Sequence, residues 1–389
     1  MKIEKIGEKL ASIRAAGQYR EVRDLRMLSA VRGVDRDGKE YLVCNSNDYL
    51  GMSHEPEVTG AAREALAWGT GSGGARLTSG GSFEMRDLEE ALARFKGKED
   101  ALLFNTGYMT NLGVLYALAG PGDVIFSDSL NHASIVDGCR ISRAEVVVYP
   151  HNDMDALEGL LQQVPARGQR FIVTDGVFSM DGDLAPVPEL VRLKEEYGAF
   201  LIVDDAHATG VIGKTGRGSS EYWRTDGIDL VVGTLSKALG AEGGFAAASR
   251  EITAYLRNVS RPFIFSTAIG PATAAAAGKA LALLAARPGR YTGRLQRNAA
   301  YLQRRLAEAG LPLLPGDTPI LPLLIGDERE AVSYAARCRK AGLLLSAIRP
   351  PSVPQGTSRI RLTVTAAHSL ADLDEACQIL TANFKGEIQ

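Results

Sequence analysis

The sequence predicts an α/β protein with a large, mostly parallel sheet and a smaller C-terminal α+β unit. Short apolar runs rich in β-branched and aromatic residues alternate with helical periods over much of the chain. This alternation is typical of strand–helix units whose strands are buried on both faces of a sheet. A second group of helical and strand patterns follows the sequence Arg-Pro-Gly-Arg at 287–290, which should break the preceding helix.

We divide the chain into residues 1–50, an N-terminal arm with a short strand; residues 51–286, the large domain; and residues 287–389, the small domain. The arm should contain an amphipathic helix within residues 1–30 and a strand at 39–44. In the large domain we expect helices at 55–68, 82–96, 107–119, 153–163, 186–198 and 268–286. Its strands are expected at 100–104, 123–127, 145–149, 170–176, 199–204, 229–234, 243–248 and 261–266. The small domain should contain helices at 290–309, 328–341 and 369–384 and strands at 319–325, 343–347 and 359–364.

Composition and charge exclude several functional classes. The net charge is −2, so no basic excess favours nucleic acid as a partner. The four cysteines are widely spaced and form no CxxC pair, and we expect reduced, packed thiols in a cytoplasmic protein and no metal site. The N-terminus lacks the apolar core of a signal peptide, and the alanine-rich stretch 268–286 contains Lys279, so we expect no membrane association.

Two segments resemble nucleotide-binding loops but lack the required context. Residues 69–74 satisfy G-x-G-x-x-G, yet they follow a helical pattern rather than a strand. Residues 208–215 approach a Walker A loop, but Ala208 replaces the first glycine and no helical pattern follows. A P-loop protein therefore stays a weak alternative.

The strongest local signal is Val-Asp-Asp-Ala-His at 203–207, where a predicted strand ends in two carboxylates and an imidazole. The carboxyl ends of parallel strands open onto the ligand crevice of a sheet. A carboxylate such as Asp204 in that place can keep a neighbouring ring nitrogen protonated. The structural alternative is a turn acid that caps the next helix.

A second signal is the lysine in Gly-Thr-Leu-Ser-Lys at 233–237, after the next predicted strand. A lysine at the end of a buried strand is costly unless it is paired or used covalently, although Lys237 on its own is also compatible with a surface position. An acid for a pyridine nitrogen and a lysine for an imine, on successive strands, are what pyridoxal 5′-phosphate (PLP) requires.

Three further segments suit the remaining parts of this cofactor. Residues 105–111 follow a predicted strand and open a helix, whose first N–H groups favour an anion such as a phosphate. His132 follows the strand at 123–127, where its imidazole could stack on a pyridine ring; a capping or core histidine is the alternative. Ser179 follows the strand at 170–176 and could donate to the cofactor's phenolate oxygen.

Seven segments in one order resemble the α-oxoamine synthase family of fold-type I PLP enzymes, and the resemblance runs from about residue 20 to the C-terminus. They are NSNDYLG (45–51), TGYMTN (106–111), NHASI (131–135), DGVFSMDGD (175–183), VDDAHATG (203–210), TLSKALG (234–240) and RIRLTVTAAH (359–368). The resemblance implies a large, mostly parallel seven-stranded sheet domain with a smaller C-terminal α+β domain. It also implies a homodimer with shared active sites.

The resemblance implies a role for each candidate residue. Lys237 would bind the cofactor covalently, Asp204 would pair with its pyridinium nitrogen, and His132 would stack on its ring. The phenolate oxygen would be addressed by His207 and Ser179. The phosphate end would be held by Gly107, Tyr108, Thr234 and Ser236, with Thr267 contributed by a second subunit. Arg361 would clamp the amino-acid carboxylate, and the other substrate-binding residues would be His132, Asn47, Arg20 and Ser352.

The segment Ala-Ile-Arg-Pro-Pro-Ser-Val-Pro at 347–354 is most similar to one branch of this family. That branch condenses L-alanine with a pimeloyl thioester, with loss of CO2, in biotin biosynthesis. Ser352 stands where threonine is expected in that branch and keeps the hydroxyl. The acyl group would arrive as pimeloyl-CoA or on an acyl-carrier protein. The alternatives are a glycine-using 2-amino-3-ketobutyrate CoA ligase or another family member, and a non-catalytic partner subunit, which the presence of both Lys237 and Asp204 disfavours.

Overall fold

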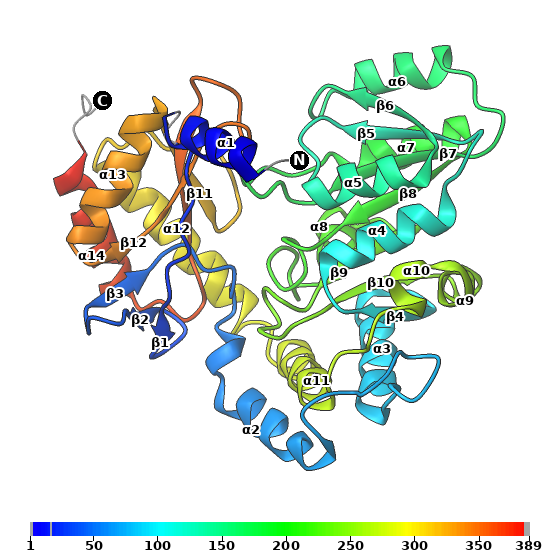
Figure 1. The fold of residues 1–389 in the computed structure, drawn as a ribbon, viewed down its shortest axis with the longest axis horizontal. Coiled ribbons are helices and arrows are strands. Elements are labelled where there is room, and N and C mark those ends of the chain that lie inside the picture. The colour runs from blue at the N-terminus through cyan, green and yellow to red at the C-terminus, as the bar shows by residue number, and fades with distance from the viewer. Residues whose placement is uncertain (1–2, 16–17, 385–389) are drawn as a thin grey trace.

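The computed structural model of the chain describes residues 3–15 and 18–384. Its centre is a seven-stranded sheet with the order β4-β10-β9-β8-β7-β5-β6 (Figure 1). Only β10 runs antiparallel to its neighbours within this sheet, and the other pairs are parallel. The predicted mostly parallel, seven-stranded α/β fold is therefore confirmed. The strands are β4 (Asp100–Phe104), β5 (Val124–Asp128), β6 (Glu145–Tyr149), β7 (Arg170–Asp175), β8 (Ala199–Asp204), β9 (Leu230–Thr234) and β10 (Gly244–Ala248).

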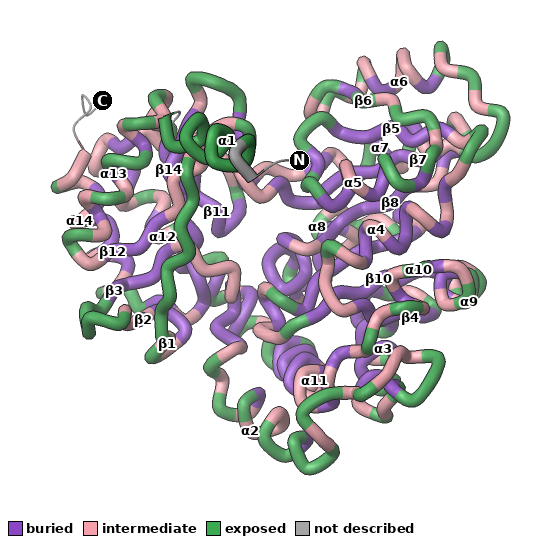
Figure 2. The backbone as a smooth tube through the Cα atoms, viewed as in Figure 1, coloured by how far each residue is buried: buried purple, intermediate pink, exposed green. Residues whose placement is uncertain are grey.

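Helices cover both faces of this sheet, which explains why its strands are mostly apolar (Figure 1). Every residue of β4, β5, β9 and β10 is buried, whereas β6, at the edge, is largely accessible. Figure 2 shows that buried backbone is concentrated in the sheet and in α11. The helices are α2 (Pro56–Ala65), α3 (Phe83–Lys96), α4 (Gly107–Leu118), α5 (Ala133–Ser142), α6 (Met154–Gln163), α7 (Val187–Tyr197), α8 (Ser219–Trp223), α9 (Arg250–Val259), α10 (Arg261–Ile264) and α11 (Pro271–Ala286).

Two smaller sheets lie on the other side of the molecule (Figure 1). One is antiparallel and consists of β11 (Ile320–Gly326), β14 (Ser358–Thr363) and β13 (Ser346–Ile348). The other joins β1 (Arg26–Met27), β2 (Arg32–Val34), β3 (Glu40–Val43) and β12 (Leu343–Leu344). The helices of this unit are α12 (Thr292–Glu308), α13 (Glu328–Lys340) and α14 (Leu370–Asn383). Because β3 pairs with β12, the N-terminal arm packs with the C-terminal part of the chain.

The structure contradicts one predicted element, the strand at 261–266, and contains helices that were not predicted. Residues 261–266 do not form a strand, since Arg261–Ile264 is the short helix α10. Pro262 occupies the first turn of this helix, where the missing N–H is not needed. The ring of Phe263 packs edge-on against Phe104, at 5.9 Å between centroids. The prediction also missed α5, α8 and α9, and the single strand expected at 343–347 is divided between β12 and β13.

The N-terminal helix α1 (Ile3–Ala15) confirms the helix expected in the arm. In the described part of the chain, no helix has the length and apolar character needed to cross a bilayer. The domain boundaries at residues 50 and 286 stay predictions.

Candidate active site

Two buried carboxylates lie side by side at the carboxyl ends of adjacent strands. Asp175 ends β7 and Asp204 ends β8, and the two residues are paired in register. Asp204 accepts a hydrogen bond from the Asn111 side-chain amide at 2.6 Å and another from the Ala206 N–H at 2.9 Å. These contacts orient the Asp204 carboxylate at the crevice where ligands of parallel sheets bind.

Asp175 was missed as a candidate, although it follows the same pattern of an acid at the end of an apolar strand. Burial raises the pKa of Asp175 well above its usual value, and the neighbouring charge of Asp204 raises it further. Its Oδ2 accepts a hydrogen bond from the His132 N–H at 2.7 Å. Asp175 therefore fixes the start of α5, where His132 is the N-cap.

Lys237 lies just after β9 and close to the two carboxylates. Burial lowers the pKa of its amine, while the charges of Asp204 and Asp175 act in the opposite direction. A lowered pKa increases the fraction of neutral amine, which is the form that can act as a nucleophile or as a base. The predicted acid and lysine are thus brought into one site.

Both candidate histidines are held as neutral rings. Burial lowers the pKa of His132, and its Nδ1 lies 2.8 Å from the Ser134 hydroxyl. Burial also lowers the pKa of His207 well below its usual value, with the charge of Lys237 acting in the same direction. The Nδ1 of His207 lies 2.7 Å from the phenol oxygen of Tyr49, which the sequence did not single out. These two imidazoles are therefore suited to act as hydrogen-bonding groups rather than as fixed positive charges.

Arg361, on β14, connects the small unit to this site. Its guanidinium donates to the Ser179 carbonyl, to Asn47 Oδ1 at 3.1 Å and to the Tyr49 hydroxyl at 3.3 Å. A buried guanidinium held in this way is a fixed positive charge that can attract a carboxylate. The structure thus brings Arg361, Asn47 and Ser179 together, and the contact with Ser179 is through its backbone oxygen.

A cradle for a phosphate lies at the start of α4. Gly107 and Tyr108 are its first two residues, and the first N–H groups of a helix have no partner within it. A Cβ at Gly107 would stand 3.2 Å from the Thr234 Cβ, so a larger residue there would have to displace Thr234 or the helix start by a few tenths of an ångström. The Ser236 N–H donates to the Thr234 hydroxyl at 3.1 Å. The four phosphate candidates are therefore neighbours in space.

Thr267 of the same chain lies beside this cradle, because its carbonyl accepts a hydrogen bond from Asn105 Nδ2 at 2.6 Å. The contribution of Thr267 from a second subunit stays a prediction.

The two acyl-substrate candidates share a groove. Arg20 and Ser352 both line a groove of about 610 Å³ next to β13. Ser352 also lines a second groove of about 340 Å³, together with Asn131 and Ser179. Ser352 therefore lies between the arm that carries Arg20 and the loops that follow β5 and β7.

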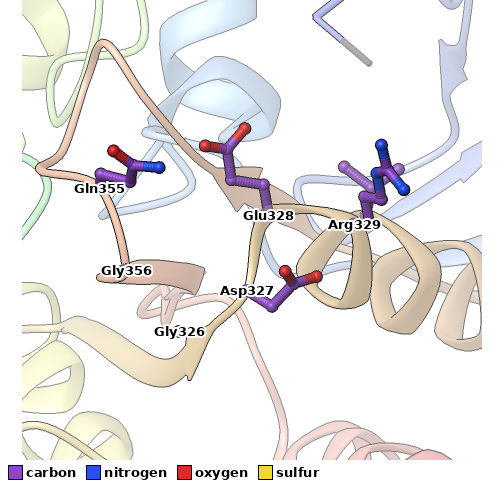
Figure 3. Close-up of a pocket in the computed structure, with 7 residues that line it drawn as sticks. Gly326, Asp327, Glu328, Arg329, Gln355 and Gly356 are labelled. Atoms are coloured by element: carbon purple, nitrogen blue, oxygen red, sulfur yellow. The ribbon is translucent and has the colours of Figure 1, made fainter. Parts of the chain in front are cut away.

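A further surface pocket of about 670 Å³ is separate from this site (Figure 3). It is lined by Asp327, Glu328 and Arg329 at the start of α13 and by residues 355–356. None of the candidate residues contributes to it, so we do not assign the reaction there.

The assembled groups fit PLP part by part. Buried Asp204 lies beside Lys237, whose pKa is lowered. The first residues of α4 lie close to the hydroxyl-bearing residues Thr234 and Ser236, which lie at and just after the end of β9. These features supply a partner for a pyridine nitrogen, an amine for an aldehyde and donors for a phosphate. The fold and the site define a PLP-dependent enzyme.

The comparisons with known proteins agree with this class. The family model described as aminotransferase class I and II matches residues 39–380. The chain therefore belongs to the aminotransferase class I and II family. It is 50% identical over 374 residues to the 8-amino-7-oxononanoate synthase of Geobacter sulfurreducens, covering 95% of each chain. It is 47% identical over 380 residues to the enzyme of that name from Citrifermentans bemidjiense, covering 97% of each.

A solved structure shows the same fold. The serine palmitoyltransferase of S. paucimobilis, with a bound PLP–myriocin aldimine, has a TM-score of 0.91 to this chain and is 32% identical in sequence. The match covers 97% of this chain and 96% of the other.

Proposed function

We propose that this protein catalyses the decarboxylative condensation of L-alanine with a pimeloyl thioester, which is the 8-amino-7-oxononanoate synthase reaction of biotin biosynthesis. The observation that carries the proposal is the grouping of Lys237 with Asp204 and Arg361, since the charges of both residues act on the Lys237 amine. The near full-length similarity to relatives named for this reaction supports the choice within the family.

PLP, when bound, supplies an electron sink for the negative charge that develops on the α-carbon of the amino acid. We assign Lys237 as its covalent partner, Asp204 as the acid that holds its ring nitrogen protonated, and His132 as the residue stacked on the ring. His207 and Ser179 are assigned to its phenolate oxygen. The phosphate is assigned to the cradle formed by Gly107, Tyr108, Thr234 and Ser236.

Arg361 orients the amino acid by attracting its carboxylate with a buried positive charge. The Asn47 amide oxygen accepts a hydrogen bond from the guanidinium and helps to hold it in place. Once released from the cofactor, the Lys237 amine would remove the proton from the α-carbon as a general base, for which its lowered pKa is suitable. The α-carbon attacks the thioester, the thiol leaves, and the resulting β-keto acid loses CO2.

His132 is neutral, and its ring can donate a hydrogen bond to the carbonyl formed in this condensation. Arg20 and Ser352 line the groove assigned to the pimeloyl group, and Arg20 is assigned to the far carboxylate of that chain. Parallel assays with pimeloyl-CoA and with pimeloyl-acyl-carrier protein will identify the thioester that the enzyme uses.

We also propose that the protein acts in the cytoplasm as a homodimer with shared active sites. Trp68, Phe83 and Phe265 are 76%, 87% and 70% exposed, which is unusual for aromatic side chains of a monomer. Ala75 and Thr267 form a β-bridge, which brings the segment after Trp68 beside the segment that contains Phe265. Since Thr267 also contacts Asn105, this apolar surface borders the phosphate cradle. The four buried, unbridged cysteines fit a reducing compartment.

The function is tested by offering the purified, PLP-loaded protein pimeloyl-CoA with either L-alanine or glycine. We expect CO2 release and 8-amino-7-oxononanoate formation with alanine, and much slower turnover with glycine. Preference for glycine with acetyl-CoA would favour a ligase of the 2-amino-3-ketobutyrate type. No turnover with any donor would favour a non-catalytic subunit.

A further inference from the structure

A histidine outside the candidate residues lies between two carboxylates behind the active-site loops. His151 follows β6, and its Nδ1 lies 3.0 Å from Asp128 Oδ1. Its Nε2 lies 2.7 Å from Asp183 Oδ2. A ring with an acidic partner on each nitrogen is doubly protonated, because both nitrogens must donate. Burial acts against the charge, yet the hydrogen bonds to Asp128 and Asp183 raise the pKa of His151 to about 10.

Asn152, the residue after His151, also forms hydrogen bonds with both Asp128 and Asp183. Asn152 adopts a left-handed φ of 53°, and its N–H donates to Asp128 Oδ2 at 2.9 Å. Its side-chain amide donates to Asp183 Oδ2 at 3.1 Å. A non-glycine residue in this conformation is uncommon and is retained where its surroundings require it. Two successive residues therefore bridge the same pair of acids.

Each acid belongs to the base of a loop that enters the active site. Asp128 ends β5 and accepts a hydrogen bond from the Leu130 N–H at 2.8 Å, in the loop that leads to His132. Asp183 lies in the loop after β7, where its carbonyl accepts a hydrogen bond from the Phe178 N–H at 3.0 Å, next to Ser179. The Phe178 ring also packs edge-on against the His151 ring, at 4.4 Å between centroids.

Both loops line the groove of about 340 Å³ that contains Ser352. Leu130 and Asn131 come from one loop, and residues 178–181 come from the other. The bridge between Asp128 and Asp183 therefore ties together two loops that line this groove, which shares Ser352 with the groove assigned to the pimeloyl group.

We propose that His151 is a positioning residue whose imidazolium holds the His132 loop and the Ser179 loop at the separation that the acyl thioester requires. The inference rests on the proposed function, since the smaller groove shares Ser352 with the groove assigned to the pimeloyl group. His151 touches neither substrate nor cofactor in this proposal, and both of its nitrogens are used by the two carboxylates.

The test compares His151→Gln with His54→Gln, a control at an exposed histidine whose ring contacts the neighbouring Ser53 hydroxyl. Glutamine carries no charge and cannot donate to both acids in the geometry of the ring. We expect the KM for pimeloyl-CoA to rise about tenfold in His151→Gln. The KM for alanine should change much less, because Arg361 keeps its contacts with Asn47 and Tyr49.

If His151→Gln does not fold, Asp183→Asn removes one charge and should raise the same KM in the same direction, by a smaller factor. An acyl KM equal to that of the wild type, in a folded variant with only a lower Tm, overturns the proposal. Inactive wild-type protein would instead contradict the proposed function.

The protonation state of His151 between Asp128 and Asp183 can be measured without enzyme activity. In protein labelled with ¹⁵N-histidine, the His151 ring, assigned by its absence in His151→Gln, should carry two protons at pH 8. A ring that titrates near pH 6.5 overturns the proposal.

Discussion

At the residue scale, two adjacent aspartates in one motif have different tasks. Asp204 faces the crevice with Asn111, whereas Asp205 turns away and forms a buried ion pair with Lys96 at 2.8 Å. Ser219 donates to the same Asp205 carboxylate. The sequence motif identified the pair but could not separate them, because the separation depends on partners far away in the chain.

We predict that Asp204→Asn lowers kcat about 100-fold or more, since a neutral amide cannot stabilise the protonated ring nitrogen. Its unfolding midpoint should change little. Steady-state kinetics and urea unfolding measure the two quantities. Near-normal kcat in this variant would show that the acid has been assigned wrongly.

Asp205→Asn provides the matched comparison. It leaves the buried Lys96 without its ion-pair partner, and breaking such a pair costs about 3–5 kcal/mol of unfolding free energy. We expect a much lower urea midpoint and a near-normal kcat in the fraction that stays folded. A large loss of kcat at unchanged stability would instead place Asp205 in the active site.

How much of the site was predictable from the sequence depended on the kind of signal. Residues at strand ends, such as Asp204 and Lys237, were found because the strand pattern placed them. Asp175 carries the same signal and was overlooked. Tyr49 and Asn111 could not have been found in this way, because each acts through a contact with a residue distant in the chain.

At the element scale, the strands of the seven-stranded sheet were predicted well from their short apolar runs. The bounds of β4, β6 and β8 agree with the runs of apolar residues. Among the missed helices, α8 has only five residues, whereas α5 and α9 have ten each, and the amphipathic pattern of α9 was overlooked. The error at 261–266 has a different origin, since Phe and Ile favour strands, while Pro262 and packing against α4 favour the short helix.

The N-terminus of α4 gives a prediction about cofactor binding. In Gly107→Ala the new Cβ would stand 3.2 Å from the Thr234 Cβ, which pushes the helix start away from β9. We expect the Kd for PLP to rise about tenfold, which corresponds to about 1.4 kcal/mol. Fluorescence titration of the apo-protein measures this Kd.

Gly60→Ala serves as the control for the alanine substitution. A Cβ at Gly60, in α2, meets no atom within 4 Å, so alanine should stabilise the helix by about 0.5–1 kcal/mol. Its Kd for PLP should equal that of the wild type. Equal Kd values for PLP in Gly107→Ala and Gly60→Ala would show that the N-terminus of α4 does not bind the phosphate.

At the scale of the whole molecule, buried His368 predicts how stability depends on pH. Burial lowers its pKa to about 4, while an unfolded histidine titrates near 6.5. Between these values the unfolded chain binds a proton that the folded chain does not, so stability falls as pH falls from about 6.5 to 4. The loss from this residue should approach roughly 3 kcal/mol.

Urea unfolding of the wild type and of His368→Asn at pH 7 and pH 4.5 measures this loss. The variant should lose less stability between the two pH values than the wild type. His54→Gln, at the exposed histidine, should follow the wild type. Parallel curves for wild type and His368→Asn would contradict the assignment.

The proposed dimer predicts the mass of the protein in solution. We predict a sedimentation mass of twice 41.5 kDa for the wild type. Phe83→Glu, at a side chain that is 87% exposed, should shift the protein toward monomer and lower its activity, because a charge would enter the apolar surface. A fully active monomer would contradict the shared active site.

The most direct measurement is the mass of the peptide that contains Lys237, after the PLP-loaded protein has been treated with borohydride. The account predicts that this peptide gains one reduced pyridoxyl group and that Lys237→Ala gains none at any position. An unmodified Lys237, or a pyridoxyl group on another lysine, would contradict the central claim.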